Sequence, residues 1–327
     1  MIFQTLLTLL LVTTSAFANP IRDLYRRDTE LLYRRASNAT YNATNTSSVG
    51  GTKLKVIVAG GTVPRSNYTT SPDVNITTLF NASSALNATQ LYQIASDINS
   101  TFGDEEYKGV VITGNEGSLE SLGFFTSLII HSAKPVVVTQ DALHGIIVAN
   151  STEAAGRGSL VVWKDWIFSG VLASTGGPKI GIIGSINEDH TVTWFYDPAL
   201  PSLIGEHSAI RNNYTNFTNT EVQSEPVIPI VYDDDYDSSL LQSLSGQVSG
   251  VVVVSSGNST ESVFGSSNSS LPIVYSYDGA FGSVSKENIP EGTIASGYLD
   301  PLKSKLLLSV AVANGVTDTT ALQHIFS

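Results

Sequence analysis

The chain has 327 residues, of which 42% are hydrophobic and 14% charged, and its net charge at pH 7 is −12. At about 100–200 residues per domain, this length predicts two domains, each large enough to bury a core. The acidic excess argues against a nucleic-acid partner, because binding phosphates requires clustered Lys and Arg. The absence of cysteine excludes disulfide scaffolds, thiol catalysis and cysteine-ligated metal sites.

The first 18 residues have the pattern of a secretory signal peptide. Leu6–Val12 is apolar except for one threonine, and Ala16-Phe17-Ala18 fits a cleavage site. The apolar run is far shorter than the ~20 residues that a spanning helix needs. The C-terminus also lacks the hydrophobic tail that attachment of a lipid anchor would require. We therefore expect secretion without a membrane anchor.

Residues 19–51 are predicted to be a pro-segment and disordered linker. They contain two dibasic pairs, Arg26-Arg27 and Arg34-Arg35, followed by a stretch of small polar residues. Dibasic pairs behind a signal peptide favour proteolytic processing, and an ordinary charged linker is the alternative.

Thirteen Asn-X-Ser/Thr sequons predict a glycoprotein that is extracellular or held in the cell wall. They begin at Asn38, Asn42, Asn45, Asn67, Asn75, Asn81, Asn87, Asn99, Asn150, Asn213, Asn216, Asn258 and Asn268.

Residues 52–205 alternate apolar runs with helical periodicity, which predicts an α/β domain with a doubly wound parallel sheet. The predicted strands are Leu54–Ala59, Gly109–Thr113, Pro135–Val138 and Ser159–Trp163. Two helices are predicted from apolar residues at helical spacing. One face would consist of Leu91, Ile94, Ala95 and Ile98, and the other, in a helix that opens at Ser118, of Leu119, Leu122, Phe125 and Ile129. Two later runs, Ile180–Ile183 and Thr191–Tyr196, flank a turn and predict a hairpin.

A polar linker, placed at 206–225, precedes a smaller α/β domain at 226–327. Its predicted strands are Val227–Tyr232, Gly250–Ser255 and Pro272–Ser276, and a helix is expected near Ser238–Leu244. A final helix should begin with Asp300 as N-cap and Pro301 at its first position.

Ligands of open α/β sheets bind at the carboxyl ends of the strands. The Gly-rich segment there, Gly60-Gly61-Thr62-Val63, matches neither a P-loop nor GxGxxG, so no nucleotide cofactor is expected. The five histidines lack metal-ligand spacing, so no metal site is expected either.

Several segments in collinear order resemble the bacterial-type (type II, secreted) L-asparaginase and glutaminase family, of which this chain would be a divergent member. They are Val58–Val63, Ser66–Thr69, Gly109–Thr113, Lys134–Val137, Arg157–Val162, Ile294–Gly297 and Asp300–Lys303, and the resemblance extends to Phe326. The resemblance implies a larger N-terminal and a smaller C-terminal α/β domain. It also implies hydrolysis of L-asparagine to L-aspartate and ammonia without a cofactor, at sites shared between subunits of a homo-oligomer.

The resemblance carries four site residues over to this chain. Thr62 falls on the family's first nucleophilic threonine and Tyr68 on its lid tyrosine. Ser83 falls on the serine that binds the substrate carboxylate, and Asn258 on the asparagine from the second domain.

The other half of the catalytic set is replaced. In the second signature the family threonine is Glu116 and the aspartate is Gly117, and the family lysine, counted from Lys164-Asp165, is Thr175. The family loop after the predicted strand Pro135–Val138 is missing, so Thr139-Gln140-Asp141 should lead directly into a helix.

These replacements predict that the family reaction is very weak or lost and that the fold serves as a binding or cell-surface protein. The alternative is an active amidohydrolase, on asparagine or another small amide, that uses Thr62 with Tyr68 and Glu116. An unrelated wall glycoprotein is a third hypothesis, based only on sequons and Ser/Thr content. If a ligand binds, the resemblance implies a small amino-acid amide.

Overall fold

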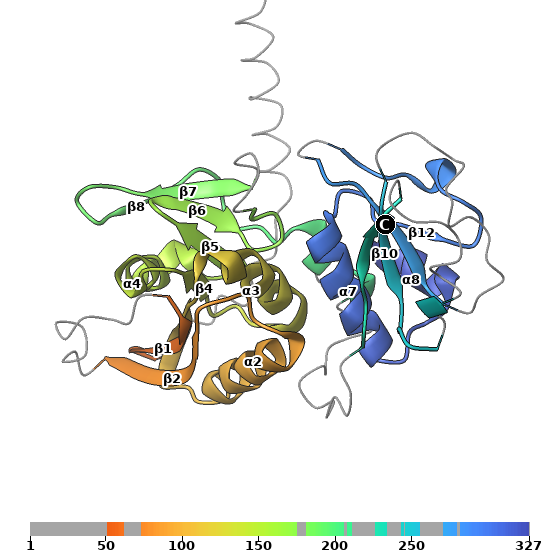
Figure 1. Cartoon of the computed structure of the whole chain (residues 1–327). Coiled ribbons are helices and arrows are strands. Elements are labelled where there is room, and N and C mark those ends of the chain that lie inside the picture. The colour runs from red at the N-terminus through yellow and green to blue at the C-terminus, as the bar shows by residue number, and fades with distance from the viewer. Residues whose placement is uncertain are drawn as a thin grey trace, which may run out of the picture. The chain divides into compact units, whose positions relative to one another are not determined.

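The computed structural model describes residues 51–61, 73–174, 181–205, 208–210, 226–233, 243–244, 246–255, 271–279 and 282–326. All of them belong to one compact unit, Val49–Ser327. Within these ranges the strands form one sheet of eight strands and one of four (Figure 1). Across the same ranges, none of the helices combines the length and apolar character that crossing a bilayer requires.

The large sheet has a parallel part and an antiparallel edge, in the order β2-β1-β3-β4-β5-β6-β7-β8. Its strands are β1 (Lys53–Gly60), β2 (Val74–Ala82), β3 (Tyr107–Thr113), β4 (Val136–Thr139), β5 (Ser159–Trp163), β6 (Trp166–Ser169), β7 (Ile182–Ile186) and β8 (Val192–Trp194). Strands β1 to β5 pair in parallel, whereas β5 to β8 pair antiparallel. The predicted hairpin is the β7–β8 pair, and β2 and β6 are strands that the sequence patterns did not predict.

Helices cover both faces of this sheet, as a doubly wound fold requires. Helices α2 (Ala88–Phe102) and α3 (Glu116–Ile129) pack on one face and α4 (Ala142–Asn150) on the other (Figure 1). Alternation along β1 serves both faces, because Ile57 belongs to the core under α2 and α3, while Val56 and Val58 belong to the core under α4.

The start of α3 differs from the prediction that it opens at Ser118. Asn115 has the extended N-cap conformation (φ −73°, ψ 163°), and the helix begins at Glu116. Ser118 lies within the first turn, where its Oγ donates a hydrogen bond to the Asn115 carbonyl at 2.9 Å. A serine that bonds back to the chain in this way occurs inside a first turn as well as at a cap.

The small sheet is parallel throughout, in the order β12-β11-β10-β9. Its elements are β9 (Ile230–Tyr232), β10 (Val251–Val254), β11 (Ile273–Ser276), β12 (Ile294–Ala295), α7 (Pro301–Ala313) and α8 (Thr319–Phe326). Asp300 caps α7, since its side chain accepts a hydrogen bond from the Lys303 backbone N–H, and proline occupies the first turn. The predicted cap is confirmed, whereas the helix predicted near 238–244 lies mostly outside the described residues.

One hydrophobic core joins elements of the two sheets. It includes Phe124 and Leu128 of α3 together with Leu307 and Val310 of α7. Ile210, inside the predicted linker, is buried in the same core. Short 3-10 helices lie at Thr152–Ala154, Ser202–Ile204 and Lys286–Asn288. The domain boundaries at 205/206 and 225/226 stay predictions.

Candidate functional site

The order of the strands places a candidate site at the carboxyl ends of β1 and β3. The chain order reverses between these neighbours, because β2 lies on one side of β1 and β3 on the other. In such sheets a ligand crevice opens at the carboxyl edge where the strand order reverses. Val58 pairs with Thr113, and Gly60 with Ala82, so the ends of three strands meet at this edge.

Glycine is required at the end of β1 because three backbone segments meet there. Gly61 has φ +71°, and a Cβ at this position would lie 2.4 Å from the Gly114 carbonyl oxygen and 3.2 Å from that of Gln140. Both the backbone conformation and the space therefore exclude a side chain. The predicted nucleophile Thr62 is the next residue, and it lies outside the described residues.

Asn115 connects the β3–α3 loop to the end of β2. Its Nδ2 donates hydrogen bonds to the Ser84 carbonyl at 2.5 Å and to the Ala82 carbonyl at 3.4 Å. Ser83, the predicted carboxylate-binding serine, lies between these two acceptors in the chain and is exposed. The structure thus brings Ser83 next to Asn115, the residue that precedes Glu116.

The first turn of α3 holds the two replaced positions of the second signature. Glu116 is exposed there, and a carboxylate in a first helical turn is favoured by the helix dipole. Gly117 is also exposed, and a Cβ added to it would meet only the Asn115 Oδ1, at 3.4 Å. A side chain would therefore fit at Gly117. Among the described residues, no neighbouring group within 4 Å, other than the Asn115 Oδ1, occupies the space at the Cβ of the aspartate that the family resemblance places here.

The end of β4 leads directly into α4, as predicted from the missing loop. Asp141 is the N-cap, and its Oδ1 accepts a hydrogen bond from the Leu143 N–H at 2.9 Å. The Asp141 N–H donates in turn to Thr139 Oγ1 at 3.1 Å. The carboxylate nearest in sequence to this strand end therefore already serves as a helix cap.

Three of the predicted site residues, Tyr68, Thr175 and Asn258, lie outside the described residues together with Thr62. Among the residues that the structure does describe, no group of three His, Asp or Glu side chains is placed to hold a metal ion.

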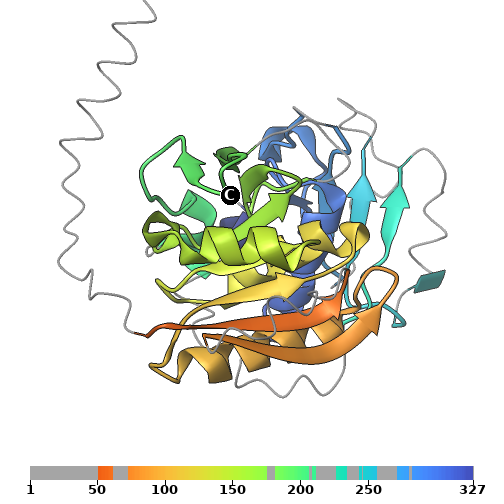
Figure 2. The same ribbon diagram turned by 90° about the vertical axis from the view of Figure 1, so that its left-hand side faces the viewer.

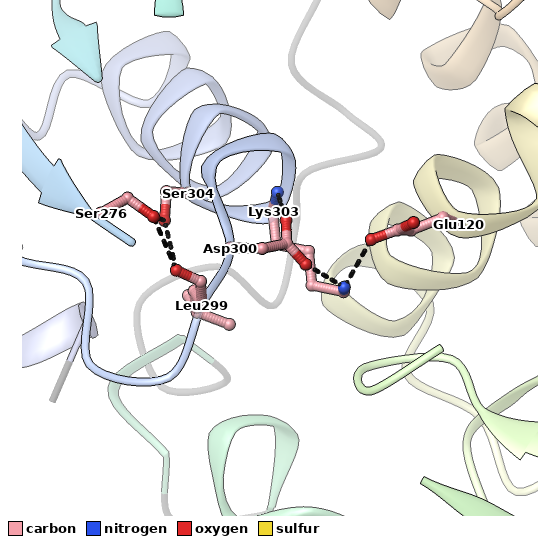
Figure 3. A network of polar contacts seen from close by, with 6 residues as sticks. All are labelled: Glu120, Ser276, Leu299, Asp300, Lys303 and Ser304. Atoms are coloured by element: carbon pink, nitrogen blue, oxygen red, sulfur yellow. Dashed lines mark hydrogen bonds and ion pairs between the residues drawn. The ribbon is translucent and has the colours of Figure 1, made fainter. Parts of the chain in front are cut away.

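An ion-pair network joins α3, one turn after the candidate site, to α7 (Figure 3). Lys303 Nζ lies 2.6 Å from Glu120 Oε1 and also pairs with Asp300 Oδ2. The Lys303 side chain is 6% exposed and that of Glu120 14%. Burial raises the pKa of the Glu120 carboxyl above its ordinary value, and the Lys303 ammonium opposes part of that rise.

Sequence reasoning missed the roles of Asn115 and Glu120. Asn115 directly precedes the replaced positions, so its place in the second signature could have drawn attention to it. No local pattern could have found Glu120, because its partner Lys303 is 183 residues away. Only the i,i+3 pair of Asp300 with Lys303 is visible in the sequence.

Comparison with known proteins gives one family match and several similar chains. The family model for the N-terminal domain of asparaginases matches residues 62–175. The chain is 38% identical to Protein YGP1 of Saccharomyces cerevisiae, over 99% of both chains. It is 38% identical to the sporulation-specific wall maturation protein of the same yeast, over 99% of this chain and 98% of that one. It is also 26% identical to the yeast L-asparaginase 2-3, over 71% of each chain.

A solved structure shares the fold. The crystal structure of a probable cytoplasmic L-asparaginase from Campylobacter jejuni has a TM-score of 0.63 and 21% identity, covering 85% of this chain and 99% of that one. The predicted fold, a larger and a smaller α/β part of the asparaginase type, is thereby confirmed.

Proposed function

This chain belongs to the asparaginase family, and we propose that it is a secreted, wall-associated glycoprotein whose asparagine hydrolysis is very weak or lost. The retained fold would act as a binding or cell-surface protein. If a ligand occupies the site, it is a small amino-acid amide or the corresponding amino acid.

The main support for this proposal is the first turn of α3. It presents Glu116 and an unfilled position at Gly117 where the family resemblance places a threonine and an aspartate. Losing the buried charge partner of a substrate ammonium costs about 2–5 kcal/mol of binding. The lysine position is Thr175, and a threonine hydroxyl is a weak nucleophile without a base or a lowered pKa. Losing members of a catalytic unit together commonly lowers kcat by ~10⁴–10⁶.

The names of the relatives support the location. The match to the sporulation-specific wall maturation protein extends over nearly the whole of both chains, at 38% identity. The match to the yeast L-asparaginase is weaker, at 26%, and covers 71% of each chain. Full-length similarity to a wall protein supports a secreted protein with a role in the wall.

The decisive assay measures ammonia released from asparagine, glutamine and small amides, with an active bacterial L-asparaginase as positive control. We expect release no faster than that of the Thr62→Ala variant. Turnover at ordinary enzyme rates that Thr62→Ala abolishes would refute the proposal.

The alternative is an active amidohydrolase that uses Thr62 with Tyr68 and Glu116. It is favoured by the exposed Glu116 carboxylate, which starts α3 at the edge that also holds Gly61, the residue before Thr62 in the sequence. This alternative requires turnover that both Thr62→Ala and Glu116→Gln abolish, while Asp141→Asn, which changes only the cap of α4, retains it.

Ligand binding is measured separately by thermal shift with L-aspartate, L-asparagine and L-glutamine. A ligand that binds only the native state raises the Tm with its concentration. A Tm increase without turnover would support a binding protein, whereas a Tm increase with turnover would support the alternative of an active amidohydrolase.

A further inference from the structure

Strand β2 is a long edge strand of the eight-stranded sheet. It pairs with β1 on one side, and no strand within the described ranges pairs with its other side (Figure 2). The opposite edge strand, β8, has only 3 residues, whereas β2 has 9. Proteins commonly keep edge strands very short, because unpaired N–H and C=O groups are a template for another chain.

The composition of β2 makes this edge hazardous. Its sequence, VNITTLFNA, contains no charged residue and no proline. β-Branched and aromatic residues without charge or proline are the pattern of segments that aggregate through strand pairing. The register irregularity between Val58 and Gly60 lies in the ladder that joins β2 to β1, so it does not protect the other side of β2. Another form of protection is therefore needed there.

Exposed sequon asparagines stand near both ends of the strand. Asn75 opens the sequon Asn-Ile-Thr and Asn81 the sequon Asn-Ala-Ser, and both side chains are exposed. The two asparagines are six positions apart, which corresponds to ~20 Å of strand, so two bulky groups would cover most of the edge. Asn75 Nδ2 donates a hydrogen bond to Tyr107 Oη at 2.8 Å, and a side-chain amide has two N–H groups, so glycosylation leaves one for this bond.

We propose that N-linked oligosaccharides on Asn75 and Asn81 protect the β2 edge from pairing with other chains. In each modification, the asparagine Nδ2 forms a bond to C1 of an oligosaccharide carried on a lipid pyrophosphate. The C1–O bond to the pyrophosphate breaks, the amide loses one proton, and the lipid pyrophosphate leaves. The hydrated glycans then take the place of the charges and prolines that other edge strands carry.

This inference rests on the secretion that is part of the proposed function, and not on activity. Peptide mapping of the protein purified from a secreting yeast tests the modification. We expect occupied Asn75 and Asn81. Bare Asn75 and Asn81 with an occupied Asn150 would overturn the edge proposal alone, whereas a chain that stays inside the cell with no occupied sequon would overturn secretion as well.

The protective role is tested by removing both sequons. Thr77→Ala removes the first and leaves the Asn75–Tyr107 bond intact, and Asn81→Gln removes the second without changing Ser83. We expect the double variant to shift toward larger, concentration-dependent species in light scattering, relative to the wild type. Asn150→Gln, which removes an exposed sequon at the end of α4, is the matched control and should show no shift.

A charge placed on the edge distinguishes edge protection from other effects of a glycan. Thr78 is exposed on β2, and a lysine on an edge strand opposes strand addition. Thr78→Lys in the double variant should restore the wild-type size distribution, or restore secretion if the double variant is retained. Failure to restore either, or a double variant that behaves like wild type, would overturn the protective role.

Discussion

Replacing Lys303 by methionine should destabilise the protein through an unpaired carboxylate. The variant leaves Glu120 facing Asp300 without the ammonium group that pairs with both. Removing one partner of a buried ion pair costs about 3–5 kcal/mol. We expect the lower end, ~3 kcal/mol, because the Asp300 side chain is 31% exposed. At ~2.1 cal/mol/K of unfolding entropy per residue, this corresponds to a Tm decrease of about 5 °C for a unit of this size.

The loss of stability should depend on pH with a defined sign. The pKa of Glu120 is raised above 4.5 by burial in the native state, so this carboxyl binds a proton more tightly when folded. Such a group contributes stability that is present below its unfolded pKa and is lost as the pH rises through the folded pKa. Lys303→Met removes the ammonium that opposes the rise of this pKa. The loss of unfolding free energy should therefore be largest at neutral pH, where the carboxylate is charged, and should become smaller as the pH falls toward 4.5 and Glu120 is protonated.

Thermal unfolding at neutral and acidic pH measures both effects. Glu120→Gln is the control, because Lys303 keeps Asp300 as its partner, and it should cost no more than about 1 kcal/mol. The double variant Lys303→Met/Glu120→Gln should recover most of the loss, since it removes the uncompensated charge. The reasoning is refuted if Lys303→Met unfolds like wild type at neutral pH, or if the double variant is no more stable than Lys303→Met.

Two further substitutions test the edge that carries the candidate site. Gly117→Ala should raise the free energy of unfolding by about 0.5–1 kcal/mol, because alanine is favoured over glycine in a helix and the Cβ has room. A loss of stability, measured by denaturant unfolding, would show that the position does not have this room. Asn115→Ser keeps a favourable N-cap residue but loses the bonds to the Ala82 and Ser84 carbonyls, which should cost roughly 0.5–1.5 kcal/mol. Amide exchange in the Ala82–Ser84 segment should become faster, and unchanged exchange would contradict the connecting role of Asn115.

Local patterns were sufficient for most of the large sheet. The buried runs of β1, β3, β4 and β5, the β7–β8 hairpin and the Asp300-Pro301 cap are visible in the sequence, because neighbouring residues determine them. Strand β2 was not predicted because it lies at an edge, where every residue is half-buried or exposed and two of them are polar asparagines. Strand β6 escaped because it has 4 residues and follows a tight turn in which Lys164 has φ +57°.

The sequence by itself determined the α/β class, the family resemblance and the replacement of the site residues at Glu116, Gly117 and Thr175. It could do so because periodicity, caps and motifs depend on residues a few positions apart. Only the tertiary structure decided that Asn115 holds the end of β2 beside the loop, that Lys303 pairs with Glu120, and that β2 is an edge strand of the large sheet. These relations join residues 31 to 183 positions apart, and they arise from how the sheets and helices pack rather than from any local pattern.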